Sequence, residues 1–346
     1  MNGITAFFIT FACKKEKLMK KNLYIVCLCG ILLSVTACTS LQPVAYERLQ
    51  PADVSFPTQI QKVGIVNNMP AVHQDYKQVD YRSASLEGDG EVATEALAQE
   101  VVSVNYFDQV VVSDKKFRKG IQPLDQPIPK ETVDELLREL GVDMLLSMER
   151  VNVELKEGVL FIPEVYASVP AVDGIVTSVV RAYLKQREEP LFTVQKTDTL
   201  CWELSPKLSY GDVIKDVSEY AASMPMRNLL PYWVEMERYY FDGGNVEMRD
   251  AGVYVREGEW DEAAVLWKKV YDKKKGKAKM RAGYNLAVYS EMKNDFEAAK
   301  DYLDTASSLA VEQSWEQQLI LLYQFKLEDE RQKNQRLNIQ MKRFEP

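Results

Sequence analysis

Histidine is nearly absent from this chain of 346 residues, which contains only His73. A metal centre built from several histidines is therefore excluded, and a catalytic triad would depend on one residue in a polar stretch. The sequence also lacks G-x-x-x-x-G-K-[ST] and G-x-G-x-x-G, the glycine patterns that hold phosphate groups. We therefore predict no catalytic residue, no metal and no cofactor, and expect a protein that is not an enzyme.

Cysteine is scarce outside the start of the chain. Three of the five cysteines precede residue 30, at Cys13, Cys27 and Cys29. Only Cys38 and Cys201 follow, so a disulfide framework is not expected. With 46% apolar and 27% charged residues, the composition is that of a globular chain held by an apolar core. Cys201, beside Trp202, is expected to pack in that core rather than react.

The chain has no apolar run long enough for a membrane-spanning helix. Its longest run, Leu23–Ala37, has 15 residues and follows Lys20 and Lys21, whereas a span needs roughly 18. This pattern is typical of a cleaved secretory signal, so residues 1–37 are assigned to a signal peptide. Whether translation begins at Met1 or at Met19 stays open.

A lipid-attachment motif ends this signal. The motif is formed by Leu33, Ser34, Val35, Thr36, Ala37 and Cys38. The six residues resemble a lipobox, which implies cleavage before Cys38 and lipidation of its thiol. Acyl chains contribute about 0.8 kcal/mol per buried methylene and hold a protein at a membrane surface. Residues 38–57 are interrupted by prolines and are expected to form a lipid-anchored tether.

The mature chain is acidic. Removing residues 1–37 deletes five lysines and one glutamate, which leaves 38 basic and 50 acidic side chains and a net charge of −12. Such a balance disfavours nucleic acid and anionic lipid as partners. Acidic pairs are unavoidable at this abundance, so Asp143 with Glu149, or Asp212 with Asp216, carries almost no catalytic signal.

Residues 58–228 are expected to form an α/β domain with a mixed sheet, because strand-like and helix-like periods alternate there. Pro129 and Gly141 bracket one helix by their positions at its start and end. The expected strands are 62–66, 107–112, 142–148, 176–184 and 191–202, and the expected helices are 92–104, 130–140 and 213–224.

Residues 229–346 are expected to form an all-α helical domain, because a sequence motif recurs there. Gly258–Ala263 reads GEWDEA, and 36 residues later Asn294–Ala299 reads NDFEAA. The tetratricopeptide period is about 34 residues. The longer spacing seen here fits an enlarged loop between the repeats, at residues 273–277. Since only two units are visible, a generic pair of helical hairpins is the alternative.

The predicted repeat-packing residues are small or aromatic side chains at the positions where such helices cross. They are Ala251, Tyr254, Gly258, Trp260, Ala263, Trp267, Leu286, Ala287, Phe296, Ala299, Leu303 and Ala306. Residues 315–327 are expected to begin a C-terminal capping helix, and the charged stretch 326–346 to be a solvated face or a frayed tail.

Aromatic residues crowd the junction between the two domains. The candidates for a partner groove are Tyr232, Trp233, Tyr239 and Tyr240. At helical spacing they are also expected as core between the domains, and a ligand or partner groove is the second interpretation.

The lipobox, the strand at 63–68, the junction 230–240 and the repeats from Ala251 together resemble an uncharacterised family of Bacteroidota lipoproteins, the domain of unknown function numbered 6340. The resemblance covers nearly the whole mature chain. It implies export and architecture but no activity. Thr39 and Ser40, which follow Cys38, are not followed by an acidic pair, and by analogy with lipoproteins of that phylum this favours the periplasmic face of the outer membrane.

These observations predict an outer-membrane lipoprotein that binds a protein or peptide partner in the envelope through helical repeats. An envelope enzyme with a cleft between its domains is one alternative. A structural subunit of an envelope assembly is the other, and a large exposed apolar patch on the α/β half would favour it.

Overall fold

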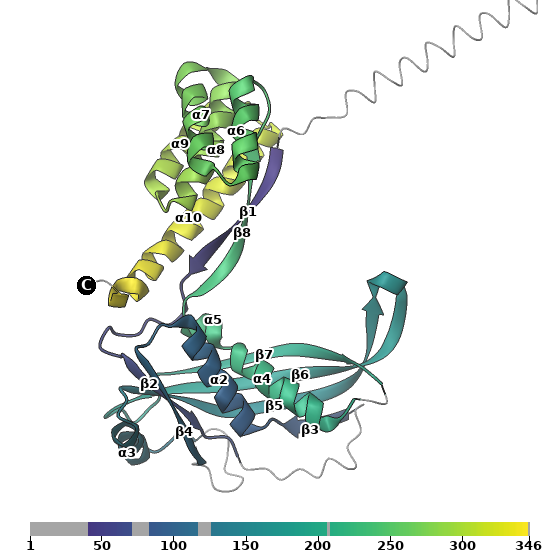
Figure 1. Ribbon diagram of the computed structural model, residues 1–346, viewed down its shortest axis with the longest axis vertical. Coiled ribbons are helices and arrows are strands. Elements are labelled where there is room, and N and C mark those ends of the chain that lie inside the picture. Colours follow the sequence, from purple (N-terminus) through teal and green to yellow (C-terminus); the bar gives the residue numbers. More distant parts are fainter. Residues whose placement is uncertain (1–40, 71–82, 117–125, 206–207, 345–346) are drawn as a thin grey trace, which may run out of the picture. The chain divides into compact units, whose positions relative to one another are not determined.

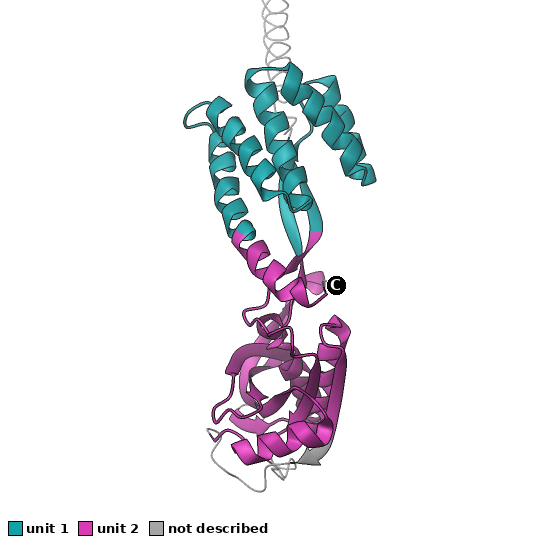
Figure 2. Ribbon diagram, turned by 90° about the vertical axis from the view of Figure 1, so that its left-hand side faces the viewer, with its two compact units in different colours: residues 1–46, 235–331 teal, residues 47–234, 332–346 magenta. Residues whose placement is uncertain are grey.

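The fold was analysed in a computed structural model, which describes residues 41–70, 83–116, 126–205 and 208–344. The chain divides into two compact units, each built from two stretches of sequence (Figure 2). One is the helical unit, formed by the described residues up to Tyr46 and by Glu235–Arg331; the other is the α/β unit, formed by Glu47–Val234 and the residues from Gln332 onward.

The α/β unit is built on a mixed six-stranded sheet in the order β4-β2-β5-β6-β7, with β3 paired to β5 (Figure 1). Strand β2 is parallel to β4 and β5, whereas the pairs β5–β6, β6–β7 and β3–β5 are antiparallel. The strands are β2 (Lys62–Asn67), β3 (Ser83–Glu87), β4 (Gln109–Lys116), β5 (Met144–Ile162), β6 (Ala167–Leu184) and β7 (Phe192–Glu203). The expected mixed sheet is thereby confirmed.

Helices cover both faces of this sheet. Alternate residues of a strand point to opposite faces, and Ile65 packs in one core with α2 and α4 whereas Val66 packs in another with α3. The helices of this unit are α2 (Gly90–Val104), α3 (Lys130–Leu140), α4 (Tyr210–Ser223) and the short α5 (Met226–Leu229). Gly141 ends α3 with φ at 65°, the left-handed conformation that the sequence predicted at this stop.

Strand β5 is far longer than the predicted 142–148. It forms a hairpin with β6 whose far end, joined by the 3-10 turn η2 (Pro163–Val165), extends beyond the other strands. Strand β3 reaches only Lys156 of β5, and β7 begins its pairing at Ala171 of β6. Beyond these points, up to η2, the ends of β5 and β6 pair only with each other. This pairing register joins residues that are distant in sequence, and local periodicity does not show it.

The helical unit contains two helical hairpins and the start of a long helix. Their helices are α6 (Val246–Glu257), α7 (Trp260–Lys273), α8 (Gly276–Met292), α9 (Phe296–Leu309) and α10 (Trp315–Met341). The repeated motif opens α7 and α9. Two residues before each helix start the backbone is left-handed, with φ 84° at Gly258 and φ 62° at Asn294, which explains the residue types found there. The unit is therefore a series of helices, consistent with the expected helical repeat.

The predicted tether 38–57 is wrong for residues 41–50, which form strand β1 (Leu41–Gln50) paired with β8 (Tyr232–Phe241) in a two-stranded sheet. The junction aromatics therefore lie on a strand and not at helical spacing. Strand β1 was missed for two reasons. Its partner β8 is distant in sequence, and two of its buried positions hold the polar residues Arg48 and Gln50, so its apolar periodicity is weak. The strands run from one unit into the other, and the boundary expected after residue 228 lies at Glu235.

The charged C-terminal stretch is not a frayed tail. Helix α10 continues to Met341, and a 3-10 turn, η3 (Lys342–Phe344), follows. Gln340 is 2% exposed and exchanges hydrogen bonds with both backbone groups of Ala52, at 3.0 and 2.9 Å. Arg343 donates to the backbone oxygen of Tyr106 and stacks over its ring at 4.1 Å. Residues 332–344, expected in the helical domain, therefore belong to the α/β unit.

A candidate binding groove in the helical unit

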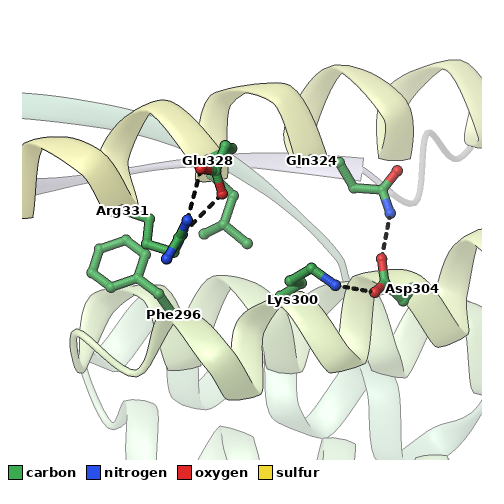
Figure 3. A pocket seen from close by; sticks show the side chains of 7 residues that line it. Phe296, Lys300, Asp304, Gln324, Glu328 and Arg331 are labelled. Atoms are coloured by element: carbon green, nitrogen blue, oxygen red, sulfur yellow. Dashed lines mark hydrogen bonds and ion pairs between the residues drawn. The ribbon is translucent and has the colours of Figure 1, made fainter.

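A groove lies between α9 and α10, within the helical unit (Figure 3). Its volume is about 250 Å³, which is enough for a few side chains rather than a large cofactor. The residues that line it are Phe296, Lys300, Asp304, Gln324, Leu327, Glu328 and Arg331. We call this set the α9–α10 groove.

The floor of the groove is apolar. Phe296, the first residue of α9, is 5% exposed, and Leu327 of α10 is 4% exposed. Asp295 holds the start of α9 by accepting a hydrogen bond from the Ala298 amide at 3.0 Å. Capping of this kind fixes the direction of the first turn and so the position of the Phe296 ring.

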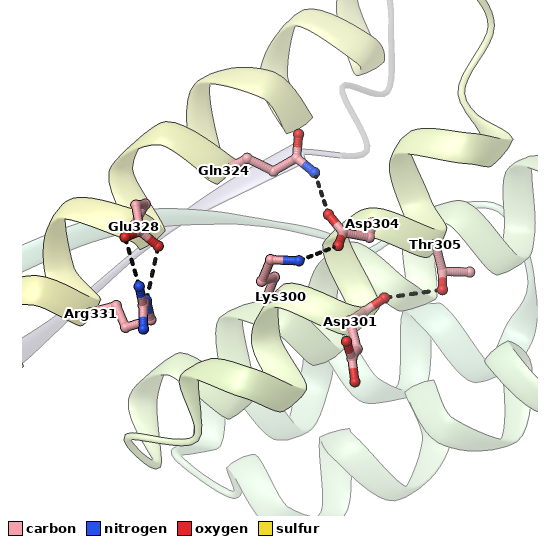
Figure 4. A network of polar contacts seen from close by, with 7 residues as sticks. All are labelled: Lys300, Asp301, Asp304, Thr305, Gln324, Glu328 and Arg331. Carbon is pink, nitrogen blue, oxygen red and sulfur yellow. Dashed lines mark hydrogen bonds and ion pairs between the residues drawn. The ribbon is translucent and has the colours of Figure 1, made fainter.

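The rim on the α9 side is polar and joins the two helices (Figure 4). Lys300 Nζ lies 2.7 Å from Asp304 Oδ2, an ion pair one turn apart on α9. Gln324 of α10 donates through Nε2 to Asp304 Oδ1 at 2.9 Å. Asp304 therefore bridges the helices, and it orients both neighbouring side chains across the groove.

The rim on the α10 side is a second ion pair. Arg331 donates from Nε and Nη2 to the two oxygens of Glu328, each at 2.9 Å, in the bidentate geometry that guanidinium favours. Glu297 lies 3.9 Å from the same guanidinium. Hydrogen bonding to Glu328 raises the pKa of Arg331, and hydrogen bonding to Asp304 raises the pKa of Lys300. Both cations therefore stay charged at neutral pH, around an apolar floor.

Most of the predicted repeat-packing residues lie in the core of the helical unit. The buried ones are Ala251, Ala263, Trp267, Leu286, Ala287, Phe296, Ala299, Leu303 and Ala306. Tyr254 is 37% exposed, Trp260 is half-buried, and Gly258 caps α6. Only Phe296 of this set also lines the groove.

The four aromatics proposed as a partner groove are not brought onto one surface. Tyr232 and Trp233 belong to the α/β unit, and Tyr239 and Tyr240 belong to the helical unit. Along β8 they alternate, so that Trp233 is 65% and Tyr239 is 37% exposed while Tyr240 is buried. Strand geometry, with its period of two, separates side chains that helical spacing would have aligned.

Two predicted residues, Cys38 and His73, lie outside the described residues. Cys201 was expected in the core, and this was wrong: it is exposed on strand β7, on the side opposite to its neighbours Leu200 and Trp202. In the described part of the chain no group of three or more histidine, cysteine and acidic side chains is placed to hold a metal ion. No helix in those same segments is both long and apolar enough to cross a membrane.

The acidic pairs serve the fold of the α/β unit. Asp143 accepts hydrogen bonds from the amides of Gln61 and Lys62, at 3.0 and 2.8 Å, and so ties β2 to β5. Ser209 caps α4 by accepting from the Asp212 amide and donates its hydroxyl to the Asp212 carboxylate, whereas Asp216 accepts from the indole of Trp202 at 3.0 Å. The members of each pair therefore have separate structural partners.

Glu149 is the exception, because it is buried at an irregularity of β5. The register of β5 against β6 shifts between Met148 and Arg150, and the carboxylate of Glu149 is 1% exposed. Tyr183 donates to one carboxylate oxygen at 2.8 Å and Asn68 to the other at 2.6 Å. Burial raises the pKa of Glu149, and these hydrogen bonds offset part of that rise. The carboxylate is satisfied and closed to solvent.

Replacing Glu149 by glutamine should change how stability depends on pH. A carboxyl whose folded pKa is raised stabilises the fold fully below its usual value of 4.5, and this contribution is lost as pH rises through the raised pKa. Glutamine cannot ionise, so the unfolding free energy of Glu149→Gln relative to the wild type should rise as the pH increases from 4.5 through the raised pKa of Glu149. Urea denaturation at several pH values measures both unfolding free energies. A difference between variant and wild type that does not change with pH would contradict a raised pKa at Glu149.

Apart from Phe296, predicted as a repeat-packing residue, the groove residues were not singled out from the sequence. The signal that could have found them is a pair of oppositely charged residues one turn apart on each of two neighbouring helices: Lys300 with Asp304, and Glu328 with Arg331. Similar pairs are common on solvated faces, as at Lys268 and Asp272. Only the packing of α10 beside α9 distinguishes them.

Fold and groove together define the class: a two-unit protein with a mixed α/β sheet and a helical-hairpin unit that carries a groove. Residues 60–241, more than half of the chain, match the family model described as Domain of unknown function (DUF8603), and the chain belongs to this family. Residues 249–329 match a second model, Domain of unknown function (DUF6340). The predicted resemblance to the family numbered 6340 is thus confirmed for the C-terminal helices, not for nearly the whole mature chain.

Two solved structures show limited similarity. The PelC dodecamer of Paraburkholderia phytofirmans is 11% identical, with a TM-score of 0.26, over 53% of this chain and 96% of that one. A minor lipoprotein of Acinetobacter baumannii is 8% identical, with a TM-score of 0.21, over 47% of this chain and 88% of that one. At these TM-scores the likeness supports no argument. No curated protein matches the chain.

Proposed function

We propose that this protein is a non-enzymatic, lipid-anchored component of the cell envelope, on the periplasmic face of the outer membrane, whose tetratricopeptide-like helices hold a protein or peptide partner. The α9–α10 groove is the observation that carries the proposal. An apolar floor surrounded by charged groups of both signs suits a polypeptide, which offers apolar side chains together with charges and backbone polar groups. The anchor rests on the lipobox-like Leu33–Cys38.

A charge reversal at the rim tests the proposal. Asp304→Lys removes the acceptor of Lys300 and Gln324 and places two cations on one rim. Asp272→Lys is the matched control, because Lys268 and Asp272 form the same pair one turn apart on α7, at 2.6 Å and with similar exposure. Tagged full-length chains would be cross-linked in cells and captured from envelope extracts.

We expect a partner that the wild type and Asp272→Lys retain and that Asp304→Lys loses by about tenfold or more. Equal capture by both variants would place binding elsewhere on the chain. In the same series, Cys38→Ala should move from the membrane fraction to the soluble envelope fraction, since it has no thiol for the lipid. Retention of Cys38→Ala in the membrane would contradict the anchor.

A structural subunit is the second candidate, and the tip of the β5–β6 hairpin favours it. Four large apolar residues there are strongly exposed: Val159 (71%), Phe161 (52%), Val165 (65%) and Tyr166 (89%). Isolated two-stranded hairpins are marginal in water, so an apolar tip of this kind suits an assembly contact. A partner retained by Asp304→Lys but lost by a Val165→Ser, Tyr166→Ser variant would favour this role.

A further inference from the structure

Helix α10 carries apolar residues on two opposite sides. Ile320, Tyr323 and Leu327 are buried against the hairpins, at 0%, 3% and 4% exposure. On the other side, Leu321, Leu322 and Phe325 are exposed, at 52%, 54% and 76%. A helix that is apolar all round is normally covered all round, and the outer face of a terminal helix in a repeat array is normally polar.

The exposed side of α10 is continuous with the α9–α10 groove. Leu321 lies one turn before Gln324 and Phe325, and Phe325 lies one turn before Glu328, so these residues share neighbouring rows of the helix surface. Gln324 and Glu328 line the groove, as Figure 3 shows. The apolar surface of Leu321 and Phe325 therefore extends the apolar floor of Phe296 and Leu327 past its polar rim.

The order in which the helices of this unit pack indicates that a further helix would cover the exposed side of α10. Helices α6, α7 and α8 each pack on the next helix along the chain. Helix α10 then contacts α8 through the rings of Tyr323 and Tyr284, 5.3 Å apart, and α9 through Gln324 and Asp304. It thus occupies the place of a first helix of a third hairpin. A second helix of that hairpin would lie on α10 and α9, along the groove, and no described element occupies this place.

We infer that the α9–α10 groove and the exposed Leu321 and Phe325 form the seat for an amphipathic helix of a partner protein, which docks as the second helix of a third hairpin. The inference rests on the proposed function and names the class of its partner. Helix-in-groove recognition uses apolar anchors one turn apart on the incoming helix. Here they would pack on Phe325, Leu321 and Leu327.

The charges beside the groove favour basic flanks on that helix. Lys300 and Arg331 are engaged by Asp304 and Glu328 of the groove itself. Glu297, 81% exposed, and Asp301 add two further carboxylates on α9, and Figure 4 shows Asp301, the residue after Lys300, one turn before Thr305. These residues carry two positive and four negative charges, so the net charge beside the groove is negative, and lysine or arginine beside the apolar stripe of the partner would complement it.

Two labelled, designed peptides test the inference against the purified mature chain. Both carry leucines along one helical face, and they differ only in having lysines or glutamates on the flanks. Fluorescence anisotropy measures binding, and circular dichroism measures whether the peptide becomes helical when bound. The variants are Phe325→Ser, and Val265→Ser as the control, since Val265 is an apolar residue 69% exposed on α7. Both positions are exposed, so neither substitution removes core packing.

We expect the lysine peptide to bind and to gain helix, the glutamate peptide to bind about tenfold more weakly or not at all, and Phe325→Ser to lose about tenfold in affinity while Val265→Ser does not. Equal binding of the two peptides, binding without helix formation, no binding, or indifference to Phe325→Ser would each overturn the inference. So would self-association of the chain that Phe325→Ser abolishes, which assigns the face to a second copy. The proposed function would survive all of these results if Asp304→Lys still loses its cellular partner.

Discussion

Replacing Glu291 by alanine is expected to destabilise the helical unit by about 3–5 kcal/mol, the cost of leaving one member of a buried ion pair alone. Glu291 of α8 is 0% exposed and accepts from Arg238 of β8 at 2.6 and 2.9 Å and from Tyr323 of α10 at 2.6 Å. Burial alone would lower the pKa of Arg238, but the hydrogen bonds and charge of Glu291 raise it. Arginine stays protonated in proteins even without such a partner, so the variant leaves a buried charge with no Glu291 carboxylate beside it.

The free energy of unfolding would be measured by urea denaturation followed by circular dichroism, with hydrogen exchange to assign the transition to the helical unit. Asp272→Ala is the control, because the exposed pair that it breaks with Lys268 is worth at most about 0.5 kcal/mol. Replacing all three partners, by Arg238→Met, Glu291→Leu and Tyr323→Phe, should recover most of the loss, since no buried charge or hydroxyl is left unpaired. A loss of less than about 1 kcal/mol in the unfolding free energy of Glu291→Ala would contradict the expectation.

Replacing Trp267 by alanine is expected to cost about 3–5 kcal/mol as well, through the cavity that a large aromatic leaves in a packed core. Trp267 of α7 is 0% exposed, and its ring lies 6.3 Å from those of both Tyr240 and Trp260. It thus joins the second helix of the first hairpin to strand β8. The loss would be measured by the same denaturation experiment.

Two comparisons make the Trp267 prediction specific. Within the described residues the indole nitrogen of Trp267 has no hydrogen-bond partner, so Trp267→Phe should cost less than Trp267→Ala because it keeps most of the ring. Val265→Ala, at a position 69% exposed on the same helix, should stay within about 0.5 kcal/mol of the wild type. Equal costs for the alanine and phenylalanine variants would show that aromatic packing is not what the position requires.

The helical hairpins could be predicted because their signals are local. Gly258 and Asn294 mark left-handed backbone at equivalent places, and Ala263 and Ala299 are fully buried one turn into the helices that follow. Small residues are required where helices cross, as at Gly283, where an added Cβ would lie 3.2 Å from the ring of Tyr271. Each of these requirements acts over a few residues of chain.

The pairing of β1 with β8 could not be predicted in the same way. Leu41 and Val44 of β1 pack on the core of the helical unit, although the chain from Glu47 to Val234 belongs to the other unit. A strand of this kind is defined by a partner far along the sequence, and no local period reports that partner. The buried Gln340 shows the same effect in the charged C-terminal stretch, because its stability comes from the backbone of Ala52.

By itself the sequence determined the acidic balance, the lipobox-like segment, the mixed α/β class and the helical repeat, since composition, periodicity and turn residues act locally. Only the tertiary structure decided that each unit is assembled from two separate stretches. It also decided that the ion pairs of Asp304 and Glu328 border one groove, and that Phe325 is exposed beside it. Such features depend on which distant segments pack together, and that choice is made by the free energy of the whole fold rather than by any one segment.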